Sequence, residues 1–306
     1  MTKQARGNGT DDFETDVVSR EIIRGKLLAV ADEMGLVLMR SSMSPVIYEV
    51  LDFACGFCDP DGDLVSQTNG ITVFTGTFSI QINVIKQKFG DRIRPGDIFM
   101  LNNPYEGGTH YNDVGVIKPI FVNDELFAFA ISISHWTDIG GKSPGSLPAD
   151  ATEIFQEGIC FPGIHIYKAG ERQDAVFEIV ANNVRLPKMA LGDLNAALAS
   201  VRIAEKRCLE LCAKYSKLAV KETFRHILES SEWVSRAAVA ALPDGVYQAE
   251  DWVDGDGISD ERFPTHVEVR IEGDTITFDY SGSCDQLQGP VNCSRSALVS
   301  AVKTIF

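Results

Sequence analysis

The stretch LNNPYEGGTHYNDVGVIKPIFVNDELFAFAISISHWTDIGGKSPG, from Leu101 to Gly145, decides how the rest of the chain is organised. It holds two His-x-x-Asp steps, His110 to Asp113 and His135 to Asp138, and each lies beside a pair of glycines. Only five histidines occur in 306 residues, so two in matching surroundings point to a shared role. We therefore predict a metal centre at the ends of strands.

An apolar run joins the two steps. Val114 to Phe121 and Leu126 to Ser134 are rich in β-branched and aromatic residues, and they predict an antiparallel pair of strands joined by a short turn. Such a hairpin would return His135 close to His110 despite their separation in sequence. The strand predicted at Ile98–Leu101 leads into a polar, glycine-rich loop, which is a common position for functional groups on a rigid scaffold.

The side chains of the stretch indicate which ions would bind. Imidazole and carboxylate groups together suit borderline divalent ions such as Mn, Fe, Zn, Co and Ni. The stretch contains no cysteine, which argues against a closed structural zinc site. An open site would let the ion lower the pKa of water or polarise a carbonyl oxygen. The alternative for each step is a histidine oriented by its neighbouring carboxylate, without a metal.

Upstream of the stretch, the apolar residues from Asp16 to about Met43 follow the helical period. Ser44-Pro45 ends this helix, because the residue before a proline avoids the helical region. Two short strands are predicted around the turn at Asp61-Gly62. Glu49 and Asp52 lie among apolar neighbours, which is costly unless they are paired or bind a cation. The alternative for each is a turn or salt-bridge residue.

Downstream, Asp150 and Glu153 have the spacing of a capping box. They predict a short helix, Ala151–Glu157, that stops at Gly158. From Asp174 to about Leu242 the pattern is mostly helical, with one apolar stripe that is typical of core packing.

From Pro243 onward, alternating residues and turn signals predict strands. Ser296 to Phe306 then starts an amphipathic helix with no cap after it, so we expect the chain to be truncated inside its second half. Together the segments predict an α+β fold. Its regions are a disordered lead (1–15), an α+β metal-site region (16–173), a helical region (174–242) and a β-rich region that is incomplete at its C terminus (243–306).

Composition excludes several classes of protein. The formal charge of −15 argues against binding nucleic acid or an anionic membrane surface. No apolar run approaches the roughly 20 residues needed to span a bilayer, and the polar N terminus does not resemble a signal peptide. We therefore expect a cytoplasmic protein with reduced cysteines. Cys55 and Cys58 form a lone C-x-x-C, which is better explained by a strand than by a zinc or redox motif.

Longer motifs carry a family resemblance. NNPYEGGTHYNDVGVIKPIF, SHWTDIGGKSPGSLPADATEIFQEGICFPG and GPVN at Gly289–Asn292 resemble the hydantoinase B/oxoprolinase family, from about Asp16 to the end. The resemblance implies the B (beta) component of an ATP-dependent cyclic amide hydrolase of the N-methylhydantoinase or 5-oxoprolinase type. It implies a hetero-oligomer in which a hydantoinase A-like ATPase subunit uses ATP to phosphorylate the substrate, before the lactam or hydantoin ring is opened at a divalent metal.

The resemblance also implies particular site residues. The implied metal ligands are Glu49, His110, Asp113 and His135. Asp52 and Asp138 are implied as catalytic groups that orient ligands or relay a proton, and the expected ion is Mn, Zn or Fe. Asn103 departs from the family pattern, which has an aspartate at this position.

Two alternatives remain open from the sequence. The first is a subunit of an ATP-dependent carboxylase of the acetone or acetophenone type, which would act on a ketone instead of a cyclic amide. The second is a non-catalytic assembly subunit that only binds its partner. The sequence does not identify the small-molecule substrate.

Overall fold

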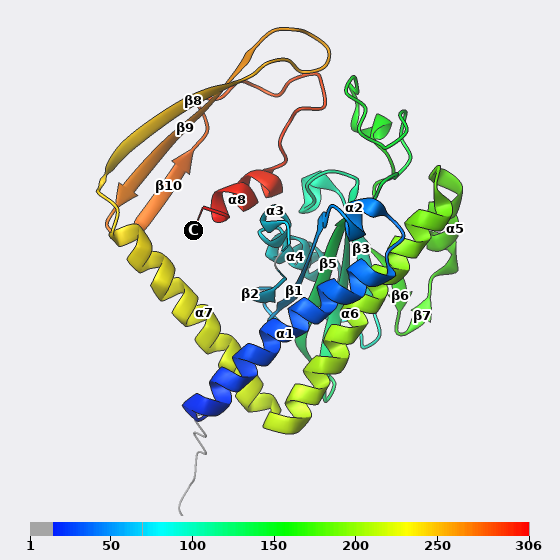
Figure 1. Ribbon diagram of the computed structural model, residues 1–306, viewed down its shortest axis with the longest axis vertical. Helices are drawn as coiled ribbons and strands as arrows, with labels where there is room; N and C mark the ends of the chain where they lie inside the picture. The colour runs from blue at the N-terminus through cyan, green and yellow to red at the C-terminus, as the bar shows by residue number, and fades with distance from the viewer. Residues whose placement is uncertain (1–14, 69, 306) are drawn as a thin grey trace, which may run out of the picture.

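One large antiparallel sheet forms the centre of the protein (Figure 1). The computed structural model describes residues 15–68 and 70–305. The strands of the large sheet are β1 (Phe53–Cys58), β2 (Leu64–Gln67), β3 (Ile98–Leu101), β4 (Asp113–Val122), β5 (Glu125–His135), β6 (Ile164–Lys168) and β7 (Glu171–Arg172). They pair in the order β2-β1-β5-β4-β3-β6-β7. The long β4–β5 hairpin therefore occupies the middle of the sheet.

Helices cover both faces of this sheet. The helices of the described residues are α1 (Val17–Ser41), α2 (Pro45–Tyr48), α3 (Thr72–Thr75), α4 (Phe78–Phe89), α5 (Asp174–Asn183), α6 (Pro187–Tyr215), α7 (Lys217–Ala240) and α8 (Arg295–Lys303), with short 3-10 turns η1 (Gly90–Arg92), η2 (Pro104–Glu106) and η3 (Ile154–Gln156). Helices α1 and α6 pack against each other on one face, and α4 lies on the other. The predicted α+β class, with its helical middle, is confirmed.

Helix α1 begins and ends where the sequence predicts. Asp16 caps its first turn, because the Asp16 carboxylate accepts a hydrogen bond of 3.0 Å from the backbone N–H of Ser19. The buried side chains recur every three or four residues and face the sheet and α6; they are Ile23, Leu27, Val30, Ala31, Met34 and Leu38. Residues 1–14 of the predicted lead lie outside the described residues, and Thr15 donates to the carboxylate of Glu222 on α7.

The central strands are buried on both sides. All but one of the ten residues of β4 are buried, so its sequence is a continuous apolar run with few polar residues. The β4–β5 turn uses Asn123 and Asp124, whose φ angles of 53° and 62° are the left-handed values of a two-residue hairpin turn. Cys55 and Cys58 are buried on β1, where burial raises the pKa of the Cys55 thiol to about 11. The strand interpretation of the C-x-x-C is confirmed.

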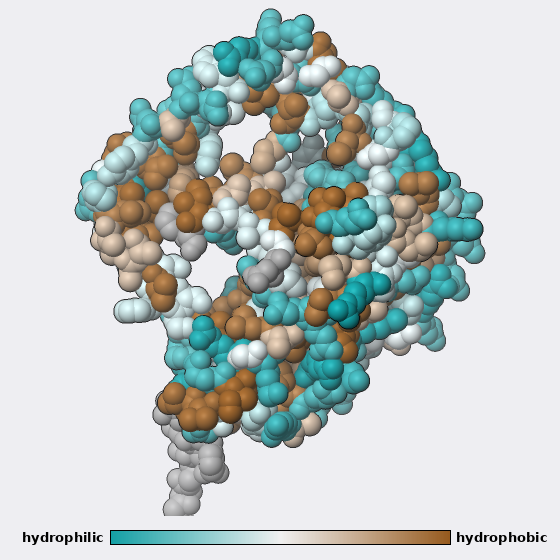
Figure 2. All heavy atoms as spheres, viewed as in Figure 1, coloured by the Kyte–Doolittle hydropathy of each residue, from teal (hydrophilic) through white to brown (hydrophobic). Residues whose placement is uncertain are grey.

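A second, smaller sheet stands apart from the main body. Its strands are β8 (Gly245–Val253), β9 (Phe263–Glu272) and β10 (Thr275–Asp279), in the order β10-β9-β8. Figure 1 shows α7 leading away from the main body to this sheet, after which the chain returns to α8 beside α3. Open gaps remain between the second sheet and the main body on either side of the returning segment (Figure 2).

The predicted helix at Ala151–Glu157 is wrong. The structure has only the 3-10 turn η3 there, and Asp150 forms no N-cap; its carboxylate lies 2.9 Å from Lys142 Nζ. The physical reason is tertiary competition for backbone groups. The carbonyl of Gln156 accepts from the N–H of Lys142 at 2.7 Å, and the N–H of Ile159 donates to a carbonyl in the same neighbouring segment. These bonds tie the end of the segment to the glycine loop. Within the segment, the N–H groups of Gln156 and Glu157 donate to carbonyls three residues earlier, which is the 3-10 pattern.

No helix in the described part of the chain is both long enough and apolar enough to cross a bilayer.

Candidate metal centre

The β4–β5 hairpin sets the position of the predicted ligands. Asp113 is the first residue of β4 and pairs directly with His135, the last residue of β5. Side chains at paired positions have Cβ atoms about 4.5–5.5 Å apart, so this register alone brings the two together. His110 lies one tight turn earlier, and its carbonyl accepts from the N–H of Asp113 at 3.0 Å. The hairpin therefore brings the two histidines together, as the sequence predicts.

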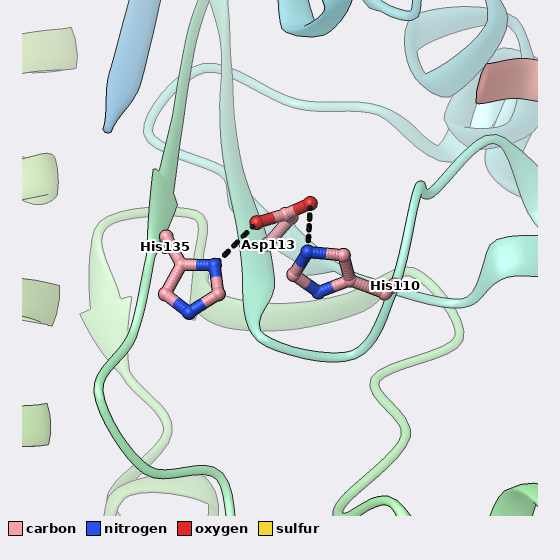
Figure 3. A group of neighbouring side chains, drawn as sticks. All are labelled: His110, Asp113 and His135. Carbon is pink, nitrogen blue, oxygen red and sulfur yellow. Dashed lines mark hydrogen bonds and ion pairs between the residues drawn. The ribbon is translucent and has the colours of Figure 1, made fainter. Parts of the chain in front are cut away.

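Asp113 bridges the two histidines (Figure 3). Its Oδ2 lies 3.1 Å from His110 Nε2, and its Oδ1 lies 3.1 Å from His135 Nδ1. The two imidazole rings are edge to face, with centroids 5.0 Å apart. We call these three side chains the His–Asp–His cluster.

Asp113 is the buried centre of the cluster, whereas the His110 side chain is 41% exposed. The Asp113 side chain is almost fully buried, and the hydroxyl of Thr109 also donates to its Oδ2. Burial lowers the pKa of His110, an effect that the nearby Asp113 carboxylate partly opposes. A lowered pKa favours the neutral imidazole, which is the form that binds metal ions.

The cluster fits a divalent ion. One ligand atom from each of its three residues lies within 4.8 Å of the others. Two imidazoles and a carboxylate are the ligands that borderline ions such as Zn²⁺, Mn²⁺ and Fe²⁺ take in open sites. His110 Nδ1 is buried and has no hydrogen-bond partner among the described residues. An unpaired buried nitrogen is costly, and coordination to an ion would relieve that cost.

Glu49, the predicted fourth ligand, lies outside the cluster. It follows α2 directly as the C-cap residue, and its side chain is exposed. The group of possible ligands that the described residues form does not include it. Its place as a ligand therefore stays a prediction.

Asp52 lies at the edge of the cluster. Its Oδ2 is 3.8 Å from His135 Nδ1, and its backbone carbonyl accepts from the N–H of His135 at 3.0 Å. Partial burial raises the pKa of the Asp52 carboxyl group, against the opposing effect of His135. The Asp52 side chain is 28% exposed, so this carboxyl group can exchange protons with solvent.

Asp138, the other predicted catalytic residue, is held by an arginine instead. Its Oδ1 lies 2.9 Å from Arg185 Nη1, and its Oδ2 accepts from the backbone N–H of Arg185 at 2.7 Å. The same guanidinium group donates to the carbonyls of Gly140 and Gly141. Asp138 and Arg185 thus fix the glycine loop beside the cluster, and the structure does not bring Asp138 into the cluster. Its role in proton transfer stays a prediction.

Asn112 is a site residue that the sequence reasoning missed. Its side-chain amide donates to the carbonyls of Trp136 at 2.8 Å and Gly145 at 3.2 Å. The backbone carbonyl of Asn112 accepts from the N–H of Trp136 at 2.8 Å. Since Asn112 lies between two cluster residues and Trp136 follows the third, these bonds tie the two ligand-bearing loops together. The signal in the sequence was that Asn112 is a polar residue directly before a strand predicted to be buried.

Asn102 has a similar role one strand away. It is fully buried, and its amide donates to the carbonyls of Tyr111 at 2.6 Å and Ile159 at 2.9 Å. Its Oδ1 accepts from the N–H of Phe161 at 2.6 Å. Asn102 therefore fixes the loop that carries His110 against the segment that leads into β6.

The C-terminal part of the chain also reaches the site loops. Ser294, the N-cap of α8, donates its hydroxyl to the carbonyl of Gly108 at 3.0 Å. A Cβ built on Gly257 would overlap the carbonyl oxygen of Ala149, so the loop after β8 contacts the loop after the cluster. These contacts place residues of the second half of the chain beside the first.

An α+β protein with a His–Asp–His cluster at the end of its central hairpin is a candidate metal protein. The chain belongs to the hydantoinase B/oxoprolinase family, whose sequence model matches residues 16–306. The resemblance seen in the motifs is thus confirmed.

Three known proteins show how far the likeness extends. The chain is 34% identical over 293 residues to the B component of a putative D-/L-hydantoinase from Pseudomonas sp. strain NS671, a match that covers 92% of this chain and 50% of that protein. The ATP-dependent caprolactamase of Pseudomonas jessenii has a solved structure that superposes with a TM-score of 0.88 at 27% identity, over 94% of this chain and 50% of that one. A nucleotide-free acetone carboxylase structure superposes with the same TM-score, 0.88, at 18% identity, over 95% of this chain and 40% of that one. At this identity the likeness shows only that the two share a fold. The chain thus spans about half the length of the hydantoinase relative.

Proposed function

We propose that this chain is part of the B component of an ATP-dependent cyclic amide hydrolase, of the hydantoinase or oxoprolinase type. The observation that carries the proposal is the His–Asp–His cluster at the end of the central hairpin, in a chain that belongs to this family. The cluster supplies the imidazole and carboxylate donors that an open divalent site needs. When bound, the ion would polarise a carbonyl oxygen or lower the pKa of water.

The chain's own residues would hold and orient the reacting groups. His110, Asp113 and His135 would hold the ion, and Glu49 would join them from the end of α2. Asp52 is beside His135, partly exposed, and has a raised pKa, so it would accept or return a proton during ring opening. Asp138 would keep the glycine loop in place through Arg185 and would assist proton transfer.

ATP would be used at a partner subunit. The sequence contains no G-x-x-x-x-G-K-[ST] phosphate loop. A hydantoinase A-like ATPase subunit would phosphorylate the substrate oxygen, and this chain would then open the activated lactam or hydantoin ring. The names of the relatives support this division, because one is the B component of a putative hydantoinase and another is an ATP-dependent caprolactamase. We propose that the complex is cytoplasmic.

The likeness favours a hydrolase over a carboxylase. The chain is 34% identical to the hydantoinase component and 27% identical to the caprolactamase, but 18% identical to the acetone carboxylase. The fold does not distinguish the two chemistries, since both solved structures superpose equally well.

Reconstitution with the partner ATPase subunit tests the proposal. The complex is expected to hydrolyse ATP only when a lactam or hydantoin is present, and to release the ring-opened product. Replacing His110 and His135 together with alanine should abolish product release while the complex still assembles. Incorporation of labelled bicarbonate into a ketone, with no lactam-dependent ATP use, would identify a carboxylase instead. Full activity with both histidines replaced would indicate an assembly subunit.

A further inference from the structure

Asp193, on α6, is a fully buried acidic residue that takes no part in the His–Asp–His cluster. Its Oδ1 accepts two backbone hydrogen bonds, at 2.7 Å from the N–H of Met43 and at 3.1 Å from the N–H of Ser44. Both donors lie in the corner where the chain passes from α1 to α2. Asp193 therefore fixes this corner to α6, although the two are 150 residues apart in the sequence.

A carboxylate is a costly choice at this position. Asp193 Oδ2 is buried and has no hydrogen-bond partner among the described residues. Burial raises the pKa of this carboxyl group, and the two backbone donors partly oppose the rise. An asparagine could accept the same two bonds without a buried charge. Charge-assisted hydrogen bonds are stronger than neutral ones, so the carboxylate holds the corner more firmly than an amide would.

The corner leads directly to the predicted carboxylates of the metal site. Ser44 is the N-cap residue of α2, and Glu49 is its C-cap. The N–H of Asp52 donates back to the carbonyl of Val46 at 3.0 Å, which closes the segment on itself. The carbonyl of Asp52 then accepts from the N–H of His135 at 3.0 Å. A shift of the corner would therefore move this whole segment relative to the cluster.

A second contact joins the corner to the loop that follows β5. Ser44 Oγ lies 2.6 Å from the hydroxyl of Thr137, two residues after His135. The hydroxyl of Ser44 does not cap α2. Helix α6 also touches the corner closely, because a Cβ built on Gly192 would overlap the side chain of Met43. Helix α6, the corner and the cluster loop are thus in contact at successive points.

We propose that Asp193 is a positioning residue for the metal centre. It holds the Met43–Ser44 corner on α6 and thereby sets where the segment with Glu49 and Asp52 lies relative to the His–Asp–His cluster. This inference rests on the proposed function, because it takes Glu49 as a further ligand of the ion. Asp193 does not touch the ion or the substrate, and it acts only through the segment 43–52.

The chain offers a matched control in Asp97. Asp97 is also buried and also accepts two backbone hydrogen bonds, at 2.8 Å from the N–H of Arg94 and at 2.7 Å from the N–H of Ala169. It precedes β3, whereas the loop toward the cluster follows β3. Asp97→Ala should therefore destabilise the fold about as much as Asp193→Ala without reaching the metal site.

The test is titration of the full, metal-free chain with Zn²⁺ and Mn²⁺ in a calorimeter. The Co²⁺ absorption bands and thermal unfolding are recorded in parallel. Asp193→Ala is expected to weaken ion binding by about 10–100-fold, as loss of a supporting contact does in other metal sites, and to change the Co²⁺ spectrum. Asp193→Asn keeps the acceptor and should restore most of the affinity. Asp97→Ala should lower the unfolding temperature and leave ion binding unchanged.

Equal loss of ion binding in the Asp193→Ala and Asp97→Ala variants would overturn the inference, and so would unchanged binding in Asp193→Ala. If Asp193→Ala does not fold, Gly192→Ala decides, because its added Cβ would overlap the side chain of Met43 and displace the same corner from α6. Several-fold weaker binding in that variant supports the inference, and unchanged binding overturns it. A wild-type chain that binds no ion would overturn the proposed function as well, which separates the two failures.

Discussion

Replacing Asn112 with alanine is expected to damage the fold and the metal site together. The Asn112 amide donates to two carbonyls, those of Trp136 and Gly145, and the variant leaves both without this donor. An unsatisfied buried group costs about 1–3 kcal/mol, and the bond to Gly145 is only partly buried, so the total loss should be about 2–3 kcal/mol in the free energy of unfolding. That corresponds to a fall of roughly 3–5 °C in the unfolding temperature for a chain of this size.

The same variant should loosen the metal site, because the two bonds join the loop of His110 to the loop of His135. We expect ion affinity to fall by about 10–100-fold, as for other supporting contacts. Thermal unfolding and calorimetric titration with Zn²⁺ would measure both effects. Asn112→Asp should be at least as damaging, since a carboxylate cannot donate to the two carbonyls.

Asn292 provides the control for this prediction. Its amide also donates to two carbonyls, those of Leu287 and Gly289, but its side chain is exposed. Water can replace these bonds, so Asn292→Ala should cost less than about 1 kcal/mol. The reasoning is refuted if Asn112→Ala unfolds at the same temperature as Asn292→Ala and binds ions as tightly as the wild type.

Two further predictions concern the buried charge on β4 and the second half of the chain. Glu205→Ala should cost about 3 kcal/mol, because it strands the buried ammonium of Lys118, which lies 3.0 Å from Glu205, whereas Lys118→Met should change stability by less than about 1 kcal/mol. Urea unfolding compares the two, and equal costs would contradict the prediction. Gly257→Ala should detach its loop from the loop at Ala149 and speed limited proteolysis there, because it adds an overlap to an unfavourable φ of +81°. Gly273→Ala, with a φ of +62° and open space around the Cβ, is its control and should not change that cleavage rate.

The part of the site that the sequence predicted is the part that local rules determine. The alternating apolar run and the Asn123-Asp124 turn define one hairpin, and that hairpin alone places His135 opposite Asp113. The same hairpin also places His110, because only one tight turn separates His110 from Asp113. These three residues needed no knowledge of how distant helices pack.

The parts that the sequence did not predict depend on contacts between distant segments. Asp138 forms an ion pair with Arg185, 47 residues later, and no pattern within either segment indicates this pairing. Asp150 begins a segment with the spacing of a capping box. In the structure its carboxylate pairs with Lys142 instead of capping a helix, and the Gln156 carbonyl bonds to the backbone of Lys142. Asp193, on α6, likewise holds the distant corner between α1 and α2.

The most direct test of the central claim is the ion content and ion affinity of the wild-type chain compared with Asp113→Ala. Asp113 contacts both histidines, so its removal should disrupt the cluster more than any other single change. We predict a single tightly bound divalent ion in the wild type, and binding weakened by about 100-fold or more in the variant. Equal ion content and equal affinity in the two proteins would contradict it.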